Sequence, residues 1–114
     1  MSETIMTIMQ WHEETFPDAT LDGQRQKYRE ELSEYVASGE KDIYELADMF
    51  IVACGIARFS LKDGTDAFSD VYDWYMAYDS FNDNALWDAI NEKMAINRKR
   101  KWTKKNGNYK HVEE

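Results

Sequence analysis

Two pairs of acidic residues, each with a spacing of three, flank a short segment that is typical of a turn. Glu31 and Glu34 precede residues 38–40, and Glu45 and Asp48 follow them. Residues three apart are neighbours on a helix surface, so each pair puts two carboxylates side by side. If two helices pack antiparallel about this turn, the acids lie at matching distances from it and converge. The spacing therefore predicts a shared site of four carboxylates.

The surroundings of Asp48 indicate what such a site binds. Asp48 is the only charged residue between Leu46 and Ala57, and an unpaired buried carboxylate costs several kcal/mol or takes up a proton. A set of oxygen ligands selects hard cations, Mg²⁺ first and Mn²⁺ as a substitute. We therefore expect Mg²⁺ to be the partner of Asp48. The alternative is that Glu31 and Glu34 are solvated helix surface, because Glu is common in helices.

Two other kinds of metal site are excluded by the sequence. A di-iron bundle needs Glu-x-x-His pairs, but Met9 and Asn108 stand three residues before the two histidines, His12 and His111. A calcium loop of the EF-hand type needs a central Gly and a final Glu. The acidic stretch of residues 79–90 has neither.

The charge is divided unevenly along the chain. Residues 1–92 hold 6 basic and 20 acidic groups, whereas residues 93–114 hold 8 basic and 2 acidic groups. The acidic part would repel a long phosphate backbone, which argues against a nucleic-acid polymer as the partner. A small, highly charged anion bridged by cations satisfies both parts.

The basic stretch contains residues suited to phosphoryl groups. Lys93, Asn97, Arg100 and Lys101 recur on one side of a predicted helix. Arg offers a fork of donors and Lys a point charge to phosphate oxygens. The alternative is a solvated face at the end of a helix, where cations complement the helix dipole.

The composition favours one all-α domain over residues 1–114. The chain is 43% hydrophobic, with one Pro and five Gly, which is too apolar for a disordered chain and poor in breakers. Hydrophobic periodicity, caps and turn signals predict a bundle of four to five helices. The expected helices span residues 2–15, 21–37, 41–61 and 66–79, and a fifth runs from 80–84 to about 101. Residues 103–114 look like a frayed polar tail.

The third expected helix is apolar nearly all round, so we expect neighbours on several sides and self-association. Its longest apolar run, residues 49–57, has nine residues, about half of the roughly 20 needed to span a bilayer. The opening MSETIM lacks a basic n-region, and Cys54 is the only cysteine. We expect a cytoplasmic protein without a membrane partner.

Two acidic motifs and one basic motif occur in a fixed order within about residues 24–102: Glu30-Glu31-x-x-Glu34, Glu45-x-x-Asp48 and Lys93-Met94-x-x-Asn97-Arg98-x-Arg100. The ordered set resembles that of the all-α nucleoside triphosphate pyrophosphohydrolases, the MazG-like superfamily. The opening stretch QWHEETFPDATLDGQRQKYREELSEY further resembles the branch described as dATP/dGTP diphosphohydrolases, found in phages and their bacterial hosts.

The resemblance implies that a nucleoside triphosphate is cleaved between its α and β phosphates, giving a monophosphate and pyrophosphate. It implies that Mg²⁺ is held by four acids: Glu31, Glu34, Glu45 and Asp48. Glu30 would be an accessory ligand or would orient the water. Metal-assisted hydrolysis of this kind needs no covalent intermediate.

The resemblance also implies where the substrate lies. Lys93, Asn97 and Arg100 match phosphate-side positions, and Arg98 falls within the same motif but either faces the phosphates or points away. The family's base pocket comes from the first helix, so the resemblance makes Trp11, His12 and Phe16 candidates for stacking on the base. The alternative for each of these side chains is a place in the hydrophobic core. Family members are homodimers or homotetramers.

Two readings from other classes stay open at this point. One is a non-catalytic nucleotide-binding or regulatory helical module on the same scaffold, which binds without hydrolysis. The other is a plain acidic interaction protein, in which Mg²⁺ does not change the melting temperature. We recognise no family motif in residues 63–84, whose aromatic and acidic residues leave the substrate's base unassigned.

Overall fold

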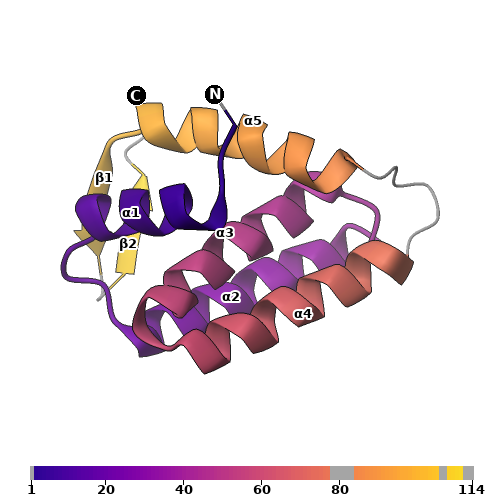
Figure 1. Ribbon diagram of the computed structural model, residues 1–114, viewed down its shortest axis with the longest axis horizontal. Helices are drawn as coiled ribbons and strands as arrows, with labels where there is room; N and C mark the ends of the chain where they lie inside the picture. Colours follow the sequence, from indigo (N-terminus) through magenta and orange to yellow (C-terminus); the bar gives the residue numbers. More distant parts are fainter. Residues whose placement is uncertain (1, 78–83, 106–107, 112–114) are drawn as a thin grey trace.

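The computed structural model describes residues 2–77, 84–105 and 108–111, and in these it is a bundle of five helices with one small hairpin (Figure 1). The elements are α1 (Ile5–Thr15), α2 (Leu21–Ala37), α3 (Ile43–Phe59), α4 (Leu61–Ala77), α5 (Ala85–Lys99), β1 (Trp102–Lys105) and β2 (Asn108–His111). The expectation of an all-α bundle is confirmed for the helices. None of the helices described has the length and apolarity needed to cross a bilayer.

Helix α3 is the centre of the bundle. Ten of its 17 residues are buried, and it packs against α1, α2, α4 and α5. Its nearly continuous apolar surface is therefore covered by neighbours from the same chain. This removes the reason for which self-association was predicted from α3. The homodimer or homotetramer implied by the family resemblance stays a prediction.

Helices α2 and α3 lie side by side and are joined by a tight reversal, as predicted (Figure 1). Thr20 caps the first turn of α2 by accepting from the Gly23 amide at 3.0 Å, and Asp42 caps α3. Between the helices, Gly39 and Glu40 both have positive φ angles, which Gly adopts readily and Glu rarely. The Tyr35 hydroxyl donates to the Glu40 carbonyl at 2.9 Å and holds this turn.

The boundary between the third and fourth helices differs from the prediction. The Asp63-Gly64 pair was expected to end the third helix, but α3 already ends at Phe59, with Ser60 as its C-cap, and both residues lie within α4. A Cβ atom on Gly64 would lie 2.5 Å from the Ala57 Cα and 2.9 Å from its nitrogen. Gly64 therefore permits close packing of α4 against α3 rather than a break in the chain. Residues 78–79 of the expected helix lie outside the described residues.

The ends of the chain also differ in detail. Helix α1 begins after Thr4, which forms a capping box with Thr7, rather than after Ser2. Helix α5 begins after Asn84 and ends at Lys99; residues 80–83 of its expected start lie outside the described residues. The expected polar tail instead contains the antiparallel pair β1–β2, in which Trp102 lies opposite His111. Residues 106–107 and 112–114 of that tail are not among those described.

Candidate functional site

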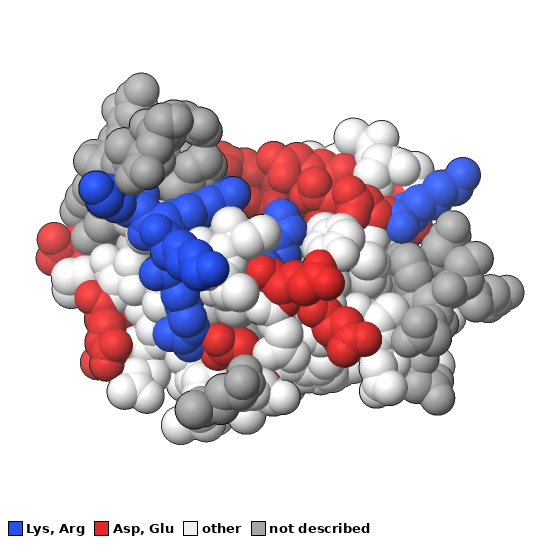
Figure 2. Space-filling model, turned by 90° about the horizontal axis from the view of Figure 1, so that it is seen from above, with Lys and Arg blue, Asp and Glu red and all other residues white. Residues whose placement is uncertain are grey.

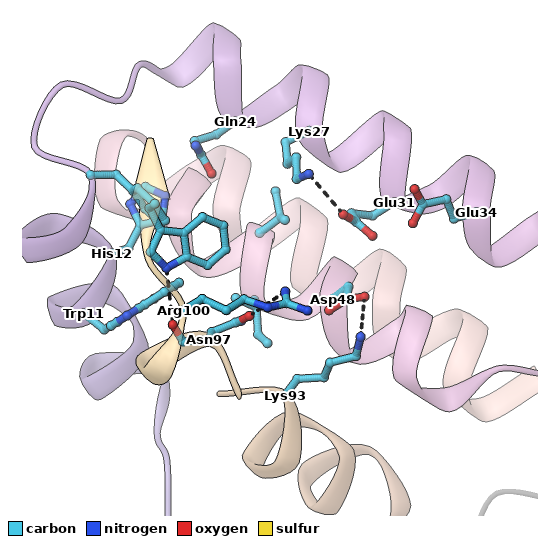
Figure 3. Close-up of a pocket in the computed structure, with 14 residues that line it drawn as sticks. Trp11, His12, Gln24, Lys27, Glu31, Glu34, Asp48, Lys93, Asn97 and Arg100 are labelled. Atoms are coloured by element: carbon cyan, nitrogen blue, oxygen red, sulfur yellow. Dashed lines mark hydrogen bonds and ion pairs between the residues drawn. The ribbon is translucent and has the colours of Figure 1, made fainter. Parts of the chain in front are cut away.

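A cavity of about 320 Å³ lies between α1, α2, α3, α5 and the start of β1. Along α2, four side chains spaced by three or four residues point into it: Gln24, Lys27, Glu31 and Glu34 (Figure 3). Asp48 and Lys93 close the end that holds the acids, and the aromatic side chains of α1 close the other (Figure 3). The cavity is therefore charged at one end and aromatic at the other.

Three of the predicted acids meet at the charged end. Glu31 from α2 and Glu45 and Asp48 from α3 each offer one oxygen, and these three oxygens lie within 4.8 Å of one another. Two oxygens on opposite sides of one Mg²⁺ are separated by roughly 4.2 Å. This cluster could hold a metal ion, and its oxygen-only donor set suits a hard cation.

The other two predicted acids are placed differently. Glu34 lies outside the three-acid cluster, but its charge and hydrogen bonding raise the pKa of both Glu31 and Glu45. It is exposed and lines the cavity. Glu30 is not among the residues that line the cavity, and its carboxylate lies 4.0 Å from the Lys27 ammonium.

The carboxylates of the cluster are only partly compensated within the part of the chain that the structure describes. Glu31 Oε2 and Glu45 Oε2 are buried without a hydrogen-bond partner, and Glu31 as a whole is only 7% exposed. Burial first, and then the charge of Asp48, raise the pKa of Glu31 to about 8 and that of Glu45 to about 7. Two buried acceptors without donors, in a cluster that resists full ionisation, are chemically suited to a bound cation.

Asp48 has a protein partner that was not predicted. The Lys93 ammonium of α5 lies 3.2 Å from Asp48 Oδ2. Burial nevertheless raises the pKa of Asp48, although Lys93 acts in the opposite direction. A second cation, Lys27 Nζ, lies 3.5 Å from Glu31 Oε1. Two lysines therefore compensate part of the negative charge of the cluster.

The basic motif divides between two sides of α5. Asn97 is buried, and Asn97, Arg100 and Lys93 all line the cavity. The Arg100 Nη1 lies 3.4 Å from Asn97 Oδ1. Arg98 instead donates from Nε and Nη2 to the two carboxylate oxygens of Glu3, each at 2.8 Å. Arg98 thus ties α5 to the N-terminal segment and is not brought to the cavity.

The three aromatic candidates lie at the opposite end. Trp11, His12 and Phe16 are buried, and all three also line the cavity. The Trp11 and Phe16 rings meet edge to face at a centroid distance of 5.3 Å. Trp102, at the start of β1, packs edge-on against Phe16 at 5.0 Å. Core packing and cavity lining are therefore combined in the same side chains.

Three polar or aromatic residues that line the cavity were not predicted from the sequence. Gln24 and Lys27 lie seven and four residues before Glu31, so extending its helical stripe toward the N-terminus would have found them. Trp102 was not predicted either, because it lies beyond the expected end of the fifth helix at about residue 101. Its indole nitrogen donates to the Asn97 carbonyl at 3.3 Å, which draws the start of β1 against the cavity.

The surface charge follows the same division. Figure 2 shows most Lys and Arg side chains of the visible face gathered where α5 ends and β1 begins, while Asp and Glu occupy much of the remainder. The lining of the cavity likewise contains both acids and cations, which suits a ligand that brings both phosphate and a cation.

Compared with family models, curated proteins and solved structures, the chain gives no match. The family resemblance therefore rests on the ordered motifs of the sequence.

Proposed function

We propose that the protein is a Mg²⁺-dependent nucleoside triphosphate pyrophosphohydrolase, with Mn²⁺ as a possible substitute for Mg²⁺. It cleaves a (deoxy)nucleoside triphosphate between the α and β phosphates and releases the monophosphate and pyrophosphate. The observation that carries the proposal is the three-acid cluster with two buried, unpartnered carboxylate oxygens, placed in one cavity with Lys93 and Arg100. The ordered motifs of the sequence support the same activity.

The residues present fit a hard divalent cation. Glu31, Glu45 and Asp48 would hold it, with Glu34 beside them. When bound, the cation would neutralise phosphate oxygens and lower the pKa of water, which is the chemistry that phosphoryl transfer requires. All-oxygen coordination and the absence of thiolate or imidazole ligands from the cluster favour Mg²⁺ over softer metals.

The cations of the cavity suit the phosphate chain. Lys93 lies at the charged end, and Arg100 lies between that end and the aromatic rings (Figure 3). Lys93 is held by Asp48 at 3.2 Å, so a phosphate oxygen can take the place of Asp48 as its partner. Arg100 is exposed at the cavity edge, where its guanidinium can reach a second phosphoryl group.

In this proposal Glu34 orients the attacking water. Glu34 is exposed and lines the cavity, whereas Glu30 does not line it. The Glu34 carboxylate accepts the proton of the attacking water as the new P–O bond forms. The bond between phosphorus and the bridging oxygen breaks, and pyrophosphate leaves with the bonding electrons.

The test is a panel of ribo- and deoxyribonucleoside triphosphates, each incubated with the protein and Mg²⁺, with separation of the products. Monophosphate and pyrophosphate in equal amounts would support the proposal. Diphosphate and inorganic phosphate would show that a different bond is cleaved. Binding without any product would favour the non-catalytic, regulatory module.

A further inference from the structure

The aromatic end of the cavity contains two polar side chains whose hydrogen bonds are directional. His12 from α1 and Gln24 from α2 lie together at this end (Figure 3). A Cβ atom on Gly55 of α3 would lie 2.5 Å from Gln24 Oε1 and 2.7 Å from His12 Nε2. Gly55 therefore leaves the space in which these two side chains meet.

Arg58 determines which nitrogen of His12 carries the proton. Its Nη1 lies 3.1 Å from His12 Nδ1 and donates to the Phe16 carbonyl at 2.8 Å. A guanidinium can only donate, so Nδ1 must accept. Burial first, and then the charge of Arg58, lower the pKa of His12 to about 4. The ring is therefore neutral at pH 7, and its single N–H is at Nε2.

The His12 proton in turn determines the orientation of the Gln24 amide. Gln24 Oε1 and His12 Nε2 both face Gly55, and the Gln24 side chain raises the pKa of His12 against the effect of burial, which is the effect expected of an acceptor beside the Nε2 donor. An amide flip would place two N–H donors against this N–H donor, so the amide is locked. Figure 3 shows the oxygen of Gln24 directed into the cavity. Gln24 is thus one of the polar residues that line the cavity.

We propose that Arg58, His12 and Gln24 form a relay that fixes the Gln24 carbonyl oxygen as an acceptor, so that the site selects bases with an exocyclic amino group. Adenine and cytosine present an amino donor on their Watson–Crick edge, whereas hypoxanthine and uracil present a carbonyl oxygen at the same position. The inference rests on the proposed function, because it takes the group at the aromatic end to be a nucleobase. Gln24 is the residue that contacts the base, and Arg58, which does not line the cavity, is a positioning residue.

The experiment compares two pairs of deoxynucleoside monophosphates, dAMP with dIMP and dCMP with dUMP, which differ at the amino or carbonyl group and its adjoining ring nitrogen. Binding to the full chain is measured by NMR titration with Mg²⁺ present. A carbonyl facing the fixed acceptor loses a hydrogen bond, so we expect the amino member to bind about tenfold more tightly in at least one pair.

Three variants separate the relay from a general effect on packing. Gln24→Met should bring the ratio within each pair close to one. Arg58→Met should do the same, because His12 can then carry its proton on Nδ1 and the Gln24 amide is free to flip. Arg58→Lys keeps a cation that can only donate and should retain the preference for the amino-bearing nucleotide. If Arg58 acted only through packing, Arg58→Lys and Arg58→Met should both lose this preference. Circular dichroism establishes that each variant is folded.

The binding measurements test the relay independently of whether triphosphates are hydrolysed. Equal binding within both pairs, a preference for the carbonyl member, or no monophosphate binding would overturn the relay, even if triphosphates are hydrolysed. Amino-selective binding that depends on Gln24 and Arg58 would support it, even if no triphosphate is hydrolysed. In that last case the pyrophosphohydrolase proposal alone would fail.

Discussion

The ammonium nitrogen of Lys93 on α5 lies 3.2 Å from a carboxylate oxygen of Asp48 on α3. This pair joins the basic and acidic motifs, which are 45 residues apart in the sequence. It also compensates the charge of Asp48, which lies among apolar residues of α3. Any divalent ion that binds Asp48 competes with Lys93, and any phosphate that binds Lys93 releases Asp48.

The first prediction concerns this competition. Replacing Lys93 by Met removes a positive charge beside the acid cluster, so Mg²⁺ alone should bind several-fold more tightly. The same change should weaken binding of a triphosphate, because a phosphate partner is lost. Isothermal titration calorimetry measures both. Lys99→Met, in the exposed last turn of α5, is the matched control. Weaker Mg²⁺ binding in Lys93→Met would contradict the competition.

The second prediction distinguishes Asp48 and Glu34, which we expect to be needed for turnover, from the neighbouring Glu30, which we do not. Asp48→Asn and Glu34→Gln should each lower turnover by about two orders of magnitude or more. Mutation of residues that only hydrogen-bond to metal ligands already lowers activity by about 10- to 100-fold. Glu30→Gln should leave turnover within a factor of about two, because Glu30 does not line the cavity. Steady-state rates on one triphosphate decide this. An inactive Glu30→Gln would restore the role that the family resemblance implies for Glu30.

The third prediction is a pH dependence of stability without divalent cations. Burial raises the pKa of Glu31 to about 8 and that of Glu45 to about 7, so the folded chain binds more protons than the unfolded chain at neutral pH. Stability should fall by about 2 kcal/mol between pH 6.5 and 8, as these protons are lost from the folded state. Urea unfolding with EDTA at both values measures this change in the free energy of unfolding.

Saturating Mg²⁺ should reduce this pH dependence, because a bound cation stabilises the ionised carboxylates. The Glu31→Gln, Glu45→Gln double variant should show little of it with or without Mg²⁺. Below pH 6.5 the protonation of His12 should partly offset the gain from the two acids, because burial lowers the pKa of His12 to about 4 and its protonation favours the unfolded chain. A stability that rises from pH 6.5 to 8 would be inconsistent with a crowded acid cluster.

The fourth prediction concerns Arg98, which binds Glu3 on the far side of α5 from the cavity. Arg98→Ala should destabilise the fold by about 0.5–1 kcal/mol, because the bidentate ion pair is partly exposed and screened. Turnover of a triphosphate should be unchanged when measured well below the melting temperature. A large loss of substrate affinity in Arg98→Ala would instead place Arg98 among the phosphate ligands.

The acid cluster and the helices that carry it were predictable from the sequence, because local rules determine them. Thr20 and Asp42 cap α2 and α3, and the spacing of the acids fixes one face of each helix. The short turn then leaves little freedom in how the two faces meet. Convergence of Glu31, Glu45 and Asp48 follows from these three facts together.

What escaped prediction depends on tertiary contacts. Gly64 carries a turn signal but lies inside α4, because Ala57 approaches too closely for any side chain. The partner of Asp48 is Lys93, which the sequence places on a distant helix. The proposed selectivity of the aromatic end rests on Arg58 and Gln24, which both act on His12. No local pattern connects these three residues.

The central claim is that the acids of α2 and α3 bind a divalent cation, and calorimetric titration of the nucleotide-free protein with Mg²⁺ tests it most directly. At pH 7 the wild-type chain should bind the ion and release protons, seen as a heat that varies with the ionisation enthalpy of the buffer. Asp48→Asn and Glu31→Gln should each lose this binding. A wild-type protein that shows no Mg²⁺ or Mn²⁺ binding, or variants that bind these ions as the wild type does, would contradict the account.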